Sequence, residues 1–187
     1  MIDNRIVNGG FETGQLAPFV PFNAAVTSTQ SHSGFFACRL TSGGINSYIY
    51  QIVDVNPGEN FEILVSLAKE GALQAPAMTI AVNYYDSLFN FIGYGLITSI
   101  PINNIPTVGN DNWLEIYQTT TPAPANAAQA LVLVNALPSP ATAPIIVDDV
   151  AMLAITGATG PPGPTGATGA PGALEYLEPW SDWSPGV

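Results

Sequence analysis

The chain has 187 residues, of which 47% are hydrophobic and only 9% are charged. This length suits one domain of about 150 residues with a tail, and the apolar fraction is large enough for a core. Three basic residues stand against 14 acidic ones, which gives a formal net charge of −11. Because so few bases neutralise few phosphates, we expect neither a nucleic-acid partner nor an anionic membrane surface.

The charged fraction is far below the roughly 25% usual for soluble proteins, which suits a surface protein that packs against copies of itself. Cys38 is the single cysteine, so no disulfide within the chain is expected, and its apolar neighbours predict a buried structural thiol. No run of 18 apolar residues predicts a membrane span. The first residues lack the pattern of a signal peptide, so export is expected by another route.

The sequence predicts no enzyme. His32 is the only histidine, it lies in a turn motif without an evident partner, and no nucleophile elbow or phosphate loop is present. Asp148 and Asp149 are adjacent, and neighbours in a strand point to opposite faces of the sheet. We therefore expect no cooperating pair of carboxylic acids.

Residues 1–156 have an all-β pattern, with short Val-, Ile-, Tyr-, Phe- and Thr-rich runs between Gly, Pro, Asn and Asp residues. Apolar residues alternate with period two in 60–68 and 77–85, and no segment keeps a helical period. About ten strands of this kind predict a jelly-roll β-sandwich domain over 1–156. The predicted strands are 5–8, 24–29, 34–41, 48–54, 60–68, 77–85, 89–96, 113–121, 128–135 and 145–154.

Residues 157–172 read GATGPPGPTGATGAPG, with glycine at every third position. A strict Gly-X-Y period rich in proline predicts a collagen-like triple-helical stalk of about 50 Å, because only glycine fits at the crowded axis of three chains. The chain is therefore expected to form a homotrimer, and a flexible linker is the alternative. The glycines of the predicted stalk are Gly157, Gly160, Gly163, Gly166, Gly169 and Gly172.

Residues 173–187 form an acidic, aromatic tail without a basic residue. The tail is expected either to dock on another molecule through Tyr176, Trp180 and Trp183 or to be a disordered terminus. Three threonines of the stalk are candidates for O-linked sugar: Thr159, Thr165 and Thr168.

Dispersed motifs in residues 4–153 resemble those of carbohydrate-binding-module jelly rolls of the galactose-binding-like kind. The motifs are NGGFETG at 8–14, HSG at 32–34, QIV at 51–53 followed by PG at 57–58, Trp113, and VDDV at 147–150. With the Gly-X-Y run behind it, the chain also resembles proteins of spore-forming bacteria that join such a domain to collagen repeats. Those relatives have longer repeats and a separate C-terminal head.

The resemblance implies two sites. A structural calcium would lie where the first and last strands meet, held by Glu12, Asp148 and Asp149 with backbone carbonyls near Gly10, since calcium takes six to eight oxygen ligands. Turn capping by these acids is the alternative. A sugar platform would need exposed aromatic rings, for which the candidates are Tyr84, Tyr85 and Trp113.

Three other rings, Phe89, Phe91 and Tyr94, lie in apolar runs and are expected to be core or subunit interface. On this interpretation an ancestral sugar site has been lost. The leading hypothesis is a structural protein of an extracellular or spore surface, such as the exosporium, in which the β-sandwich trimerises and organises the collagen-like stalk. Further assembly of the trimers into fibres is left open. The alternative is a carbohydrate-binding module displayed on a stalk, as in an adhesin or a phage fibre.

Overall fold

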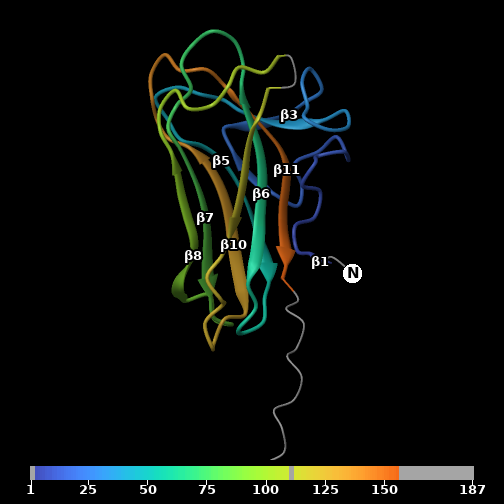
Figure 1. The fold of residues 1–187 in the computed structure, drawn as a ribbon, viewed down its shortest axis with the longest axis vertical. Coiled ribbons are helices and arrows are strands. Elements are labelled where there is room, and N and C mark those ends of the chain that lie inside the picture. Colours follow the sequence, from blue (N-terminus) through green and yellow to red (C-terminus); the bar gives the residue numbers. More distant parts are fainter. Residues whose placement is uncertain (1–2, 110–111, 156–187) are drawn as a thin grey trace, which may run out of the picture. The chain divides into compact units, whose positions relative to one another are not determined.

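The computed structural model describes residues 3–109 and 112–155, which form a β-sandwich of two antiparallel sheets (Figure 1). No helix occurs in these ranges, so none is long and apolar enough to cross a membrane. The chain divides between Thr156 and Gly157. The predicted stalk at 157–172 and the predicted docking tail at 173–187 lie outside the described residues and remain predictions.

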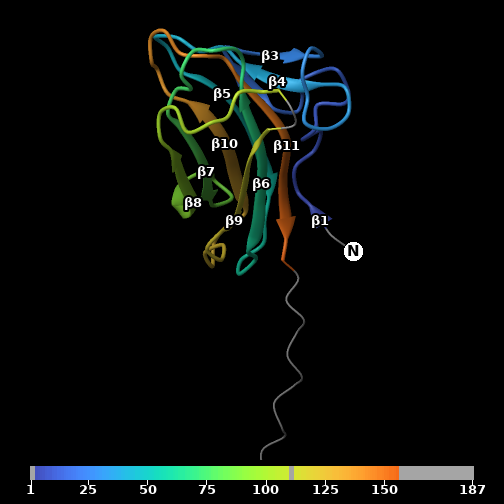
Figure 2. The same ribbon diagram turned by 45° about the horizontal axis from the view of Figure 1, so that its top comes forward.

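One sheet has the strand order β3-β4-β11-β6-β9, with β1 paired to β11 (Figure 2). Every strand pair in it is antiparallel, and β11 lies near its centre between β4 and β6. Its strands are β1 (Asp3–Asn4), β3 (Ala24–Thr27), β4 (Ala37–Leu40), β6 (Phe61–Lys69), β9 (Leu114–Thr119) and β11 (Ile145–Ala154).

The second sheet has five strands in the order β2-β5-β10-β7-β8. Strand β10 pairs along its whole length with β5 on one side and β7 on the other. Its strands are β2 (Val20–Phe22), β5 (Ser47–Asp54), β7 (Met78–Tyr85), β8 (Phe91–Ile100) and β10 (Gln129–Ala136).

The core lies between the two sheets and is built by period-two alternation. In β5 the odd-numbered residues from 47 to 53 are buried, and in β10 the even-numbered residues from 130 to 136 are buried. Aliphatic side chains fill most of the space, and the largest fully buried rings are Phe11, Phe61 and Tyr84. The all-β, two-sheet prediction is confirmed.

Cys38 lies in this core at 0% exposure, as predicted for a structural thiol. Burial raises the pKa of its thiol to about 12. The thiolate form is therefore scarce at neutral pH.

Two predicted strands at the N-terminal side were misplaced, and one observed strand was not predicted. Only Asp3–Asn4 pairs as a strand, and in place of the predicted strand 5–8 the backbone of Val7 is bonded to the side chain of Gln51. The predicted strand 34–41 begins at Ala37, because the preceding residues form a turn. The short edge strand Val20–Phe22 was missed, because proline at its centre is unusual in a strand.

Candidate functional site

The outward face of the five-stranded sheet, here called the sheet face, is lined by apolar and aromatic side chains. The registers align its residues across the strands, as in the row Val20, Tyr50, Leu133, Ala81 and Ile97. No described segment covers the exposed members of the face. The sheet face comprises Val20, Phe22, Tyr48, Tyr50, Ile52, Thr79, Ala81, Asn83, Tyr85, Phe91, Tyr94, Ile97, Ser99, Leu131, Leu133 and Asn135.

An aromatic cluster occupies the corner of this face where β7 turns into β8. Tyr85 and Phe89 stack with ring centroids 4.3 Å apart and an angle of 6° between the rings. Phe91 meets Tyr85 edge-on at 6.0 Å and lies 4.8 Å from Tyr94. Phe89, Phe91 and Tyr94 are 46%, 48% and 59% exposed, so they are not core residues, and the alternative that they form a subunit interface stays a prediction.

The turn between β7 and β8 holds Phe89 over Tyr85. The Asp86 carboxylate accepts hydrogen bonds from the backbone N–H groups of Leu88 (2.9 Å) and Asn90 (2.8 Å). Phe89 has a φ of 62°, a left-handed conformation that this Asp-centred turn imposes on a non-glycine residue. The stacked pair is therefore fixed by the local backbone before any ligand arrives.

A second aromatic group lies at the opposite edge of the sheet face, on β2 and β5. Phe22 and Tyr48 stack at 5.2 Å with 19° between the rings, and Tyr50 lies 6.3 Å from Tyr48. Leu131 and Leu133 of the central strand β10 lie between the two aromatic groups in the register of the sheet. The face thus has flat rings at two edges and aliphatic side chains between them.

Two asparagines bring unsatisfied polar groups to the sheet face. The side-chain oxygens of Asn83 and Asn135 are buried and accept no hydrogen bond in the described chain. Asn83 pairs across the sheet with Tyr94, and Asn135 pairs with Tyr48. A buried acceptor without a partner costs about 1–3 kcal/mol, and a ligand hydroxyl would reach these two oxygens only after the side chains that cover them move.

None of the sheet-face residues is basic. All three basic side chains are engaged elsewhere: Arg5 bonds Glu59, Arg39 bonds Glu70, and Lys69 donates to the carbonyls of Gly71 and Leu73. The sheet face therefore offers no positive charge to an anionic ligand.

Of the predicted platform residues, only Tyr85 lies on the sheet face. Tyr84 is 0% exposed, and its hydroxyl donates to the Thr121 carbonyl at 2.8 Å, so assigning it to an exposed platform was wrong. Trp113 precedes β9 in the other sheet and lies 5.1 Å from the His32 ring. These three side chains do not form one surface.

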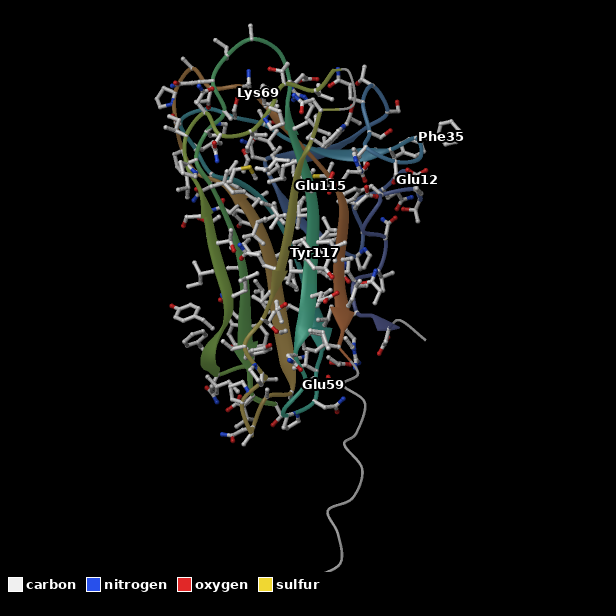
Figure 3. The ribbon with its side chains drawn as sticks, viewed as in Figure 1. Glu12, Phe35, Glu59, Lys69, Glu115 and Tyr117 are labelled. Atoms are coloured by element: carbon white, nitrogen blue, oxygen red, sulfur yellow. The ribbon has the colours of Figure 1, made fainter. Side chains whose placement is uncertain are left out.

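The predicted calcium residues do come together, at the corner that Figure 3 labels with Glu12 and Phe35. Glu12 Oε1 accepts hydrogen bonds from the N–H groups of Phe35 and Phe36, both at 2.9 Å. Asp148 Oδ2 accepts from the N–H groups of His32 (2.8 Å) and Ser33 (3.1 Å). The acids therefore tie the loop at 31–36 to the sandwich.

The carboxylates of Asp148 and Asp149 both bond the loop at 31–36. This is contrary to the prediction that adjacent residues of a strand point to opposite faces of the sheet. A register shift in β11 follows Asp148, and Asp149 has a φ of 49°. This β-bulge turns the Asp149 carboxylate toward the same loop, where it bonds His32 Nδ1 (2.5 Å) and Ser33 Oγ (2.6 Å). A bulge of one residue is not visible in an apolar pattern.

His32 has partners on both ring nitrogens, which the sequence did not indicate. Besides Asp149, its Nε2 lies 3.1 Å from Glu115 Oε1, and Glu115 also accepts from the Ser66 hydroxyl at 2.9 Å. The hydrogen bond to Asp149 is the main cause that raises the pKa of His32. Burial raises the pKa of Asp148 to about 6.

The residues at this corner suit a hard cation in part. A Cβ added at Gly34 would lie 2.3 Å from Glu12 Oε1, so glycine at this position lets the backbone approach the Glu12 carboxylate. Within residues 3–109 and 112–155, no group of three or more His, Cys, Asp or Glu side chains is placed to hold a metal. Carbonyls and water would have to complete the six to eight oxygens of calcium, which remains a prediction.

No protein-family model and no curated protein sequence match the chain. Solved structures do match. A family 16 carbohydrate-binding module is 16% identical with a TM-score of 0.61, covering 80% of this chain and 99% of that one. The module TmCBM61, solved with β-1,4-galactotriose, is 17% identical with a TM-score of 0.55, covering 80% and 97%.

Proteins named for catalysis share the fold as well. The enzymatically active domain of tailspike protein 4 from bacteriophage CBA120 is 15% identical with a TM-score of 0.62, over 81% of this chain but only 21% of the tailspike chain. A cyclase from Fischerella sp. is 12% identical with a TM-score of 0.59, over 82% of this chain and 96% of that one. Most of the similar structures described by name are carbohydrate-binding modules, so the chain has the jelly-roll β-sandwich fold of those modules.

We predict that calcium binding at Glu12 and Asp148 raises the melting temperature of the chain. A ligand that binds only the folded state stabilises it, and about 1 kcal/mol moves the midpoint of a domain this size by roughly 2–4 °C. Thermal unfolding is measured after chelation, with and without millimolar calcium, beside a Glu12→Gln control in which the shift should be lost. Equal melting temperatures with and without calcium would contradict the prediction.

Proposed function

We propose that the domain is a carbohydrate-binding module that binds a glycan on the sheet face. The observation that carries the proposal is the exposed aromatic cluster of Tyr85, Phe89, Phe91 and Tyr94. The apolar C–H faces of a sugar stack on flat rings, and its hydroxyl groups donate to fixed acceptors. The fold supports this proposal, because named neighbours with it are carbohydrate-binding modules, one of them a xylan-binding domain.

The charge of the face favours an uncharged glycan. Its polar groups are neutral amides, hydroxyls and phenols, and Asp54 and Asp86 lie at its borders. A carboxylate or sulfate on the ligand would meet these acids and no base. Binding rather than catalysis is the proposed role, at an extracellular or spore surface.

Truncating a ring of the aromatic cluster should weaken glycan binding without unfolding the domain. Phe91→Ala and Tyr94→Ala each remove a half-exposed ring and should lower the affinity about tenfold, the size of one lost stacking contact. The measurement is a glycan array with the intact chain, followed by calorimetric titration of the strongest neutral glycan. Phe35→Ala is the matched control, because this ring is 79% exposed and lies outside the sheet face. A glycan array without any binding signal would contradict the proposal. An equal loss of affinity in all three variants would contradict it as well.

The second candidate function is a structural, trimer-forming surface protein. The glycine register at 157–172 favours it, and the uncharged sheet face would also suit packing between subunits. The two functions compete for the sheet face, because a face buried between copies does not bind sugar. They are compatible when the residues after 156 bring the copies together.

The solution mass of the intact chain and of a version ending at Thr156 separates these arrangements. We expect only the intact chain to be trimeric, which leaves the sheet face accessible for a glycan on a stalked binding domain. Light scattering behind gel filtration gives both masses. Trimers in both samples would assign the sandwich to assembly, and monomers in both would show that the Gly-X-Y run is a linker.

A further inference from the structure

Four loops that join one sheet to the other meet at one end of the sandwich, the end at which Figure 3 labels Lys69. The pairing registers place them there. Ala136, the last residue of β10, pairs with Ser47, where β5 begins, and with Met78, where β7 begins. Met78 in turn pairs with Ile100, where β8 ends. The four loops, here called the sandwich tip, are residues 41–46, 70–77, 101–109 and 137–144.

The sandwich tip is apolar and carries no uncompensated charge. Each loop exposes one large aliphatic side chain, at 40–56% exposure: Ile45, Leu73, Ile102 and Leu137. These four ranges contain no aromatic residue, and Glu70 is their only charged residue. Its carboxylate is already engaged, because Glu70 Oε2 accepts from Arg39 Nε at 2.8 Å. The exposed side chains of the tip therefore differ from those of the sheet face, which are largely aromatic.

Hydrogen bonds between the loops fix the shape of the tip. The loop at 70–77 is the common partner, because its carbonyls accept from the N–H groups of Asn103 (3.0 Å), Leu137 (2.9 Å) and Ala143 (2.8 Å). Beneath it the Lys69 ammonium, on a side chain that is buried, donates to two carbonyls of the same loop at 2.7 and 3.1 Å. A surface that is already ordered loses little conformational entropy when a partner covers it.

We propose that the sandwich tip is an interface through which two copies of this chain associate, tip against tip. A formal net charge of −11 makes copies repel one another, so contact is least unfavourable where the surface has no uncompensated acid. A two-fold contact places the same patch on both sides, and neutral aliphatic side chains complement themselves whereas like charges do not. The end of β11 at Ala154 pairs with Phe61, at the other end of the sandwich, so the described exit of the chain leaves the tip uncovered.

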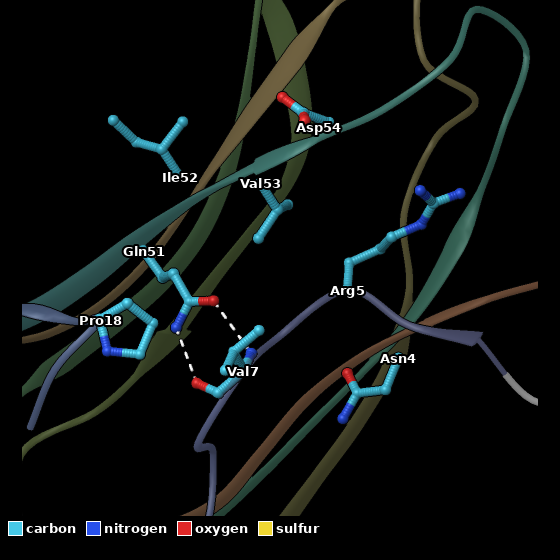
Figure 4. A pocket seen from close by; sticks show the side chains of 8 residues that line it. All are labelled: Asn4, Arg5, Val7, Pro18, Gln51, Ile52, Val53 and Asp54. Atoms are coloured by element: carbon cyan, nitrogen blue, oxygen red, sulfur yellow. Dashed lines mark hydrogen bonds between the residues drawn. The ribbon is translucent and has the colours of Figure 1, made fainter.

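Other ligands fit the tip less well. It offers no flat ring to a sugar, and its nearest ammonium, that of Lys69, is buried and bonded to carbonyls. The hollow of about 410 Å³ beside β5 makes a contrast (Figure 4). Arg5 and Asp54 are among the residues that line it, and a second copy would have to remove water from these charges.

The size of the tip limits the strength of the contact. Five strands about 4.8 Å apart and two sheets about 10 Å apart give the end of a sandwich an area of a few hundred Å². A standard stable interface buries about 800 Å² on each partner. We therefore expect a reversible association that depends on protein concentration.

Sedimentation velocity of the intact chain over a range of concentrations tests this association. We expect the mass at high concentration to be twice that at the lowest concentration. Added sodium chloride should strengthen the association, because it screens the repulsion between acidic copies. Leu73→Asp places a charge in the contact and should raise the dissociation constant at least about tenfold. Leu88→Asp is the matched control, since Leu88 is 82% exposed in the turn between β7 and β8, and this variant should associate like the unchanged chain.

Cross-linking locates the contact. Because Cys38 is fully buried, a cysteine introduced at the surface is the reactive thiol. A bifunctional thiol reagent should join copies that carry Leu137→Cys, and it should not join copies that carry Ile97→Cys on the sheet face. A mass that does not change with concentration, or joining through Ile97→Cys alone, would overturn the proposal. An equal loss of association in Leu73→Asp and Leu88→Asp would overturn it as well. No glycan enters these assays, so this inference and the proposed function can fail separately.

Discussion

The alternation of buried and outward-facing side chains along each strand is the constraint on which the rest of the structure depends. In β5 and β10 every second residue enters the core, so the intervening residues must line the outward face. In a chain with 9% charged residues, tyrosine, isoleucine, leucine and asparagine fill those intervening positions except at the strand ends, which hold Gln129 and Asp54. The same alternation that buries Ile49 and Val132 therefore builds an apolar, aromatic surface on the other side. Such an exposed apolar surface indicates a ligand or a partner.

The other sheet is built differently, because loops cover part of its outward side. Asp148 is the last paired residue before a β-bulge that contains Asp149, and together with Glu12 the two aspartates hold the loop at 31–36. Ile146 points outward from β11 yet is fully buried. The two sheets therefore differ in their outward sides. The sheet that contains β11 anchors loops through its acidic residues, and the five-stranded sheet exposes its apolar and aromatic side chains.

Much of the fold could be predicted from the sequence, and the site only in part. The alternation in 77–85 already put Tyr84 on the same side as Ile80 and Val82, so its burial followed from the pattern although it was proposed for the platform. The exposure of Phe91 could not be predicted, because an edge strand with an apolar outward face has the same composition as a buried one. The convergence of Asp148 and Asp149 depended on a left-handed residue in a bulge, which no residue type signals.

The most direct test of the central claim is to locate a bound glycan by methyl NMR. The intact chain is labelled at isoleucine, leucine and valine methyl groups and titrated with the strongest neutral glycan from the array. The account predicts shifts concentrated on Leu131 and Leu133, which lie between the two aromatic groups of the sheet face, and on Ile97, which shares β8 with Phe91 and Tyr94. Shifts concentrated on Leu64 and Leu153 of the other sheet, with the sheet face unchanged, would contradict it.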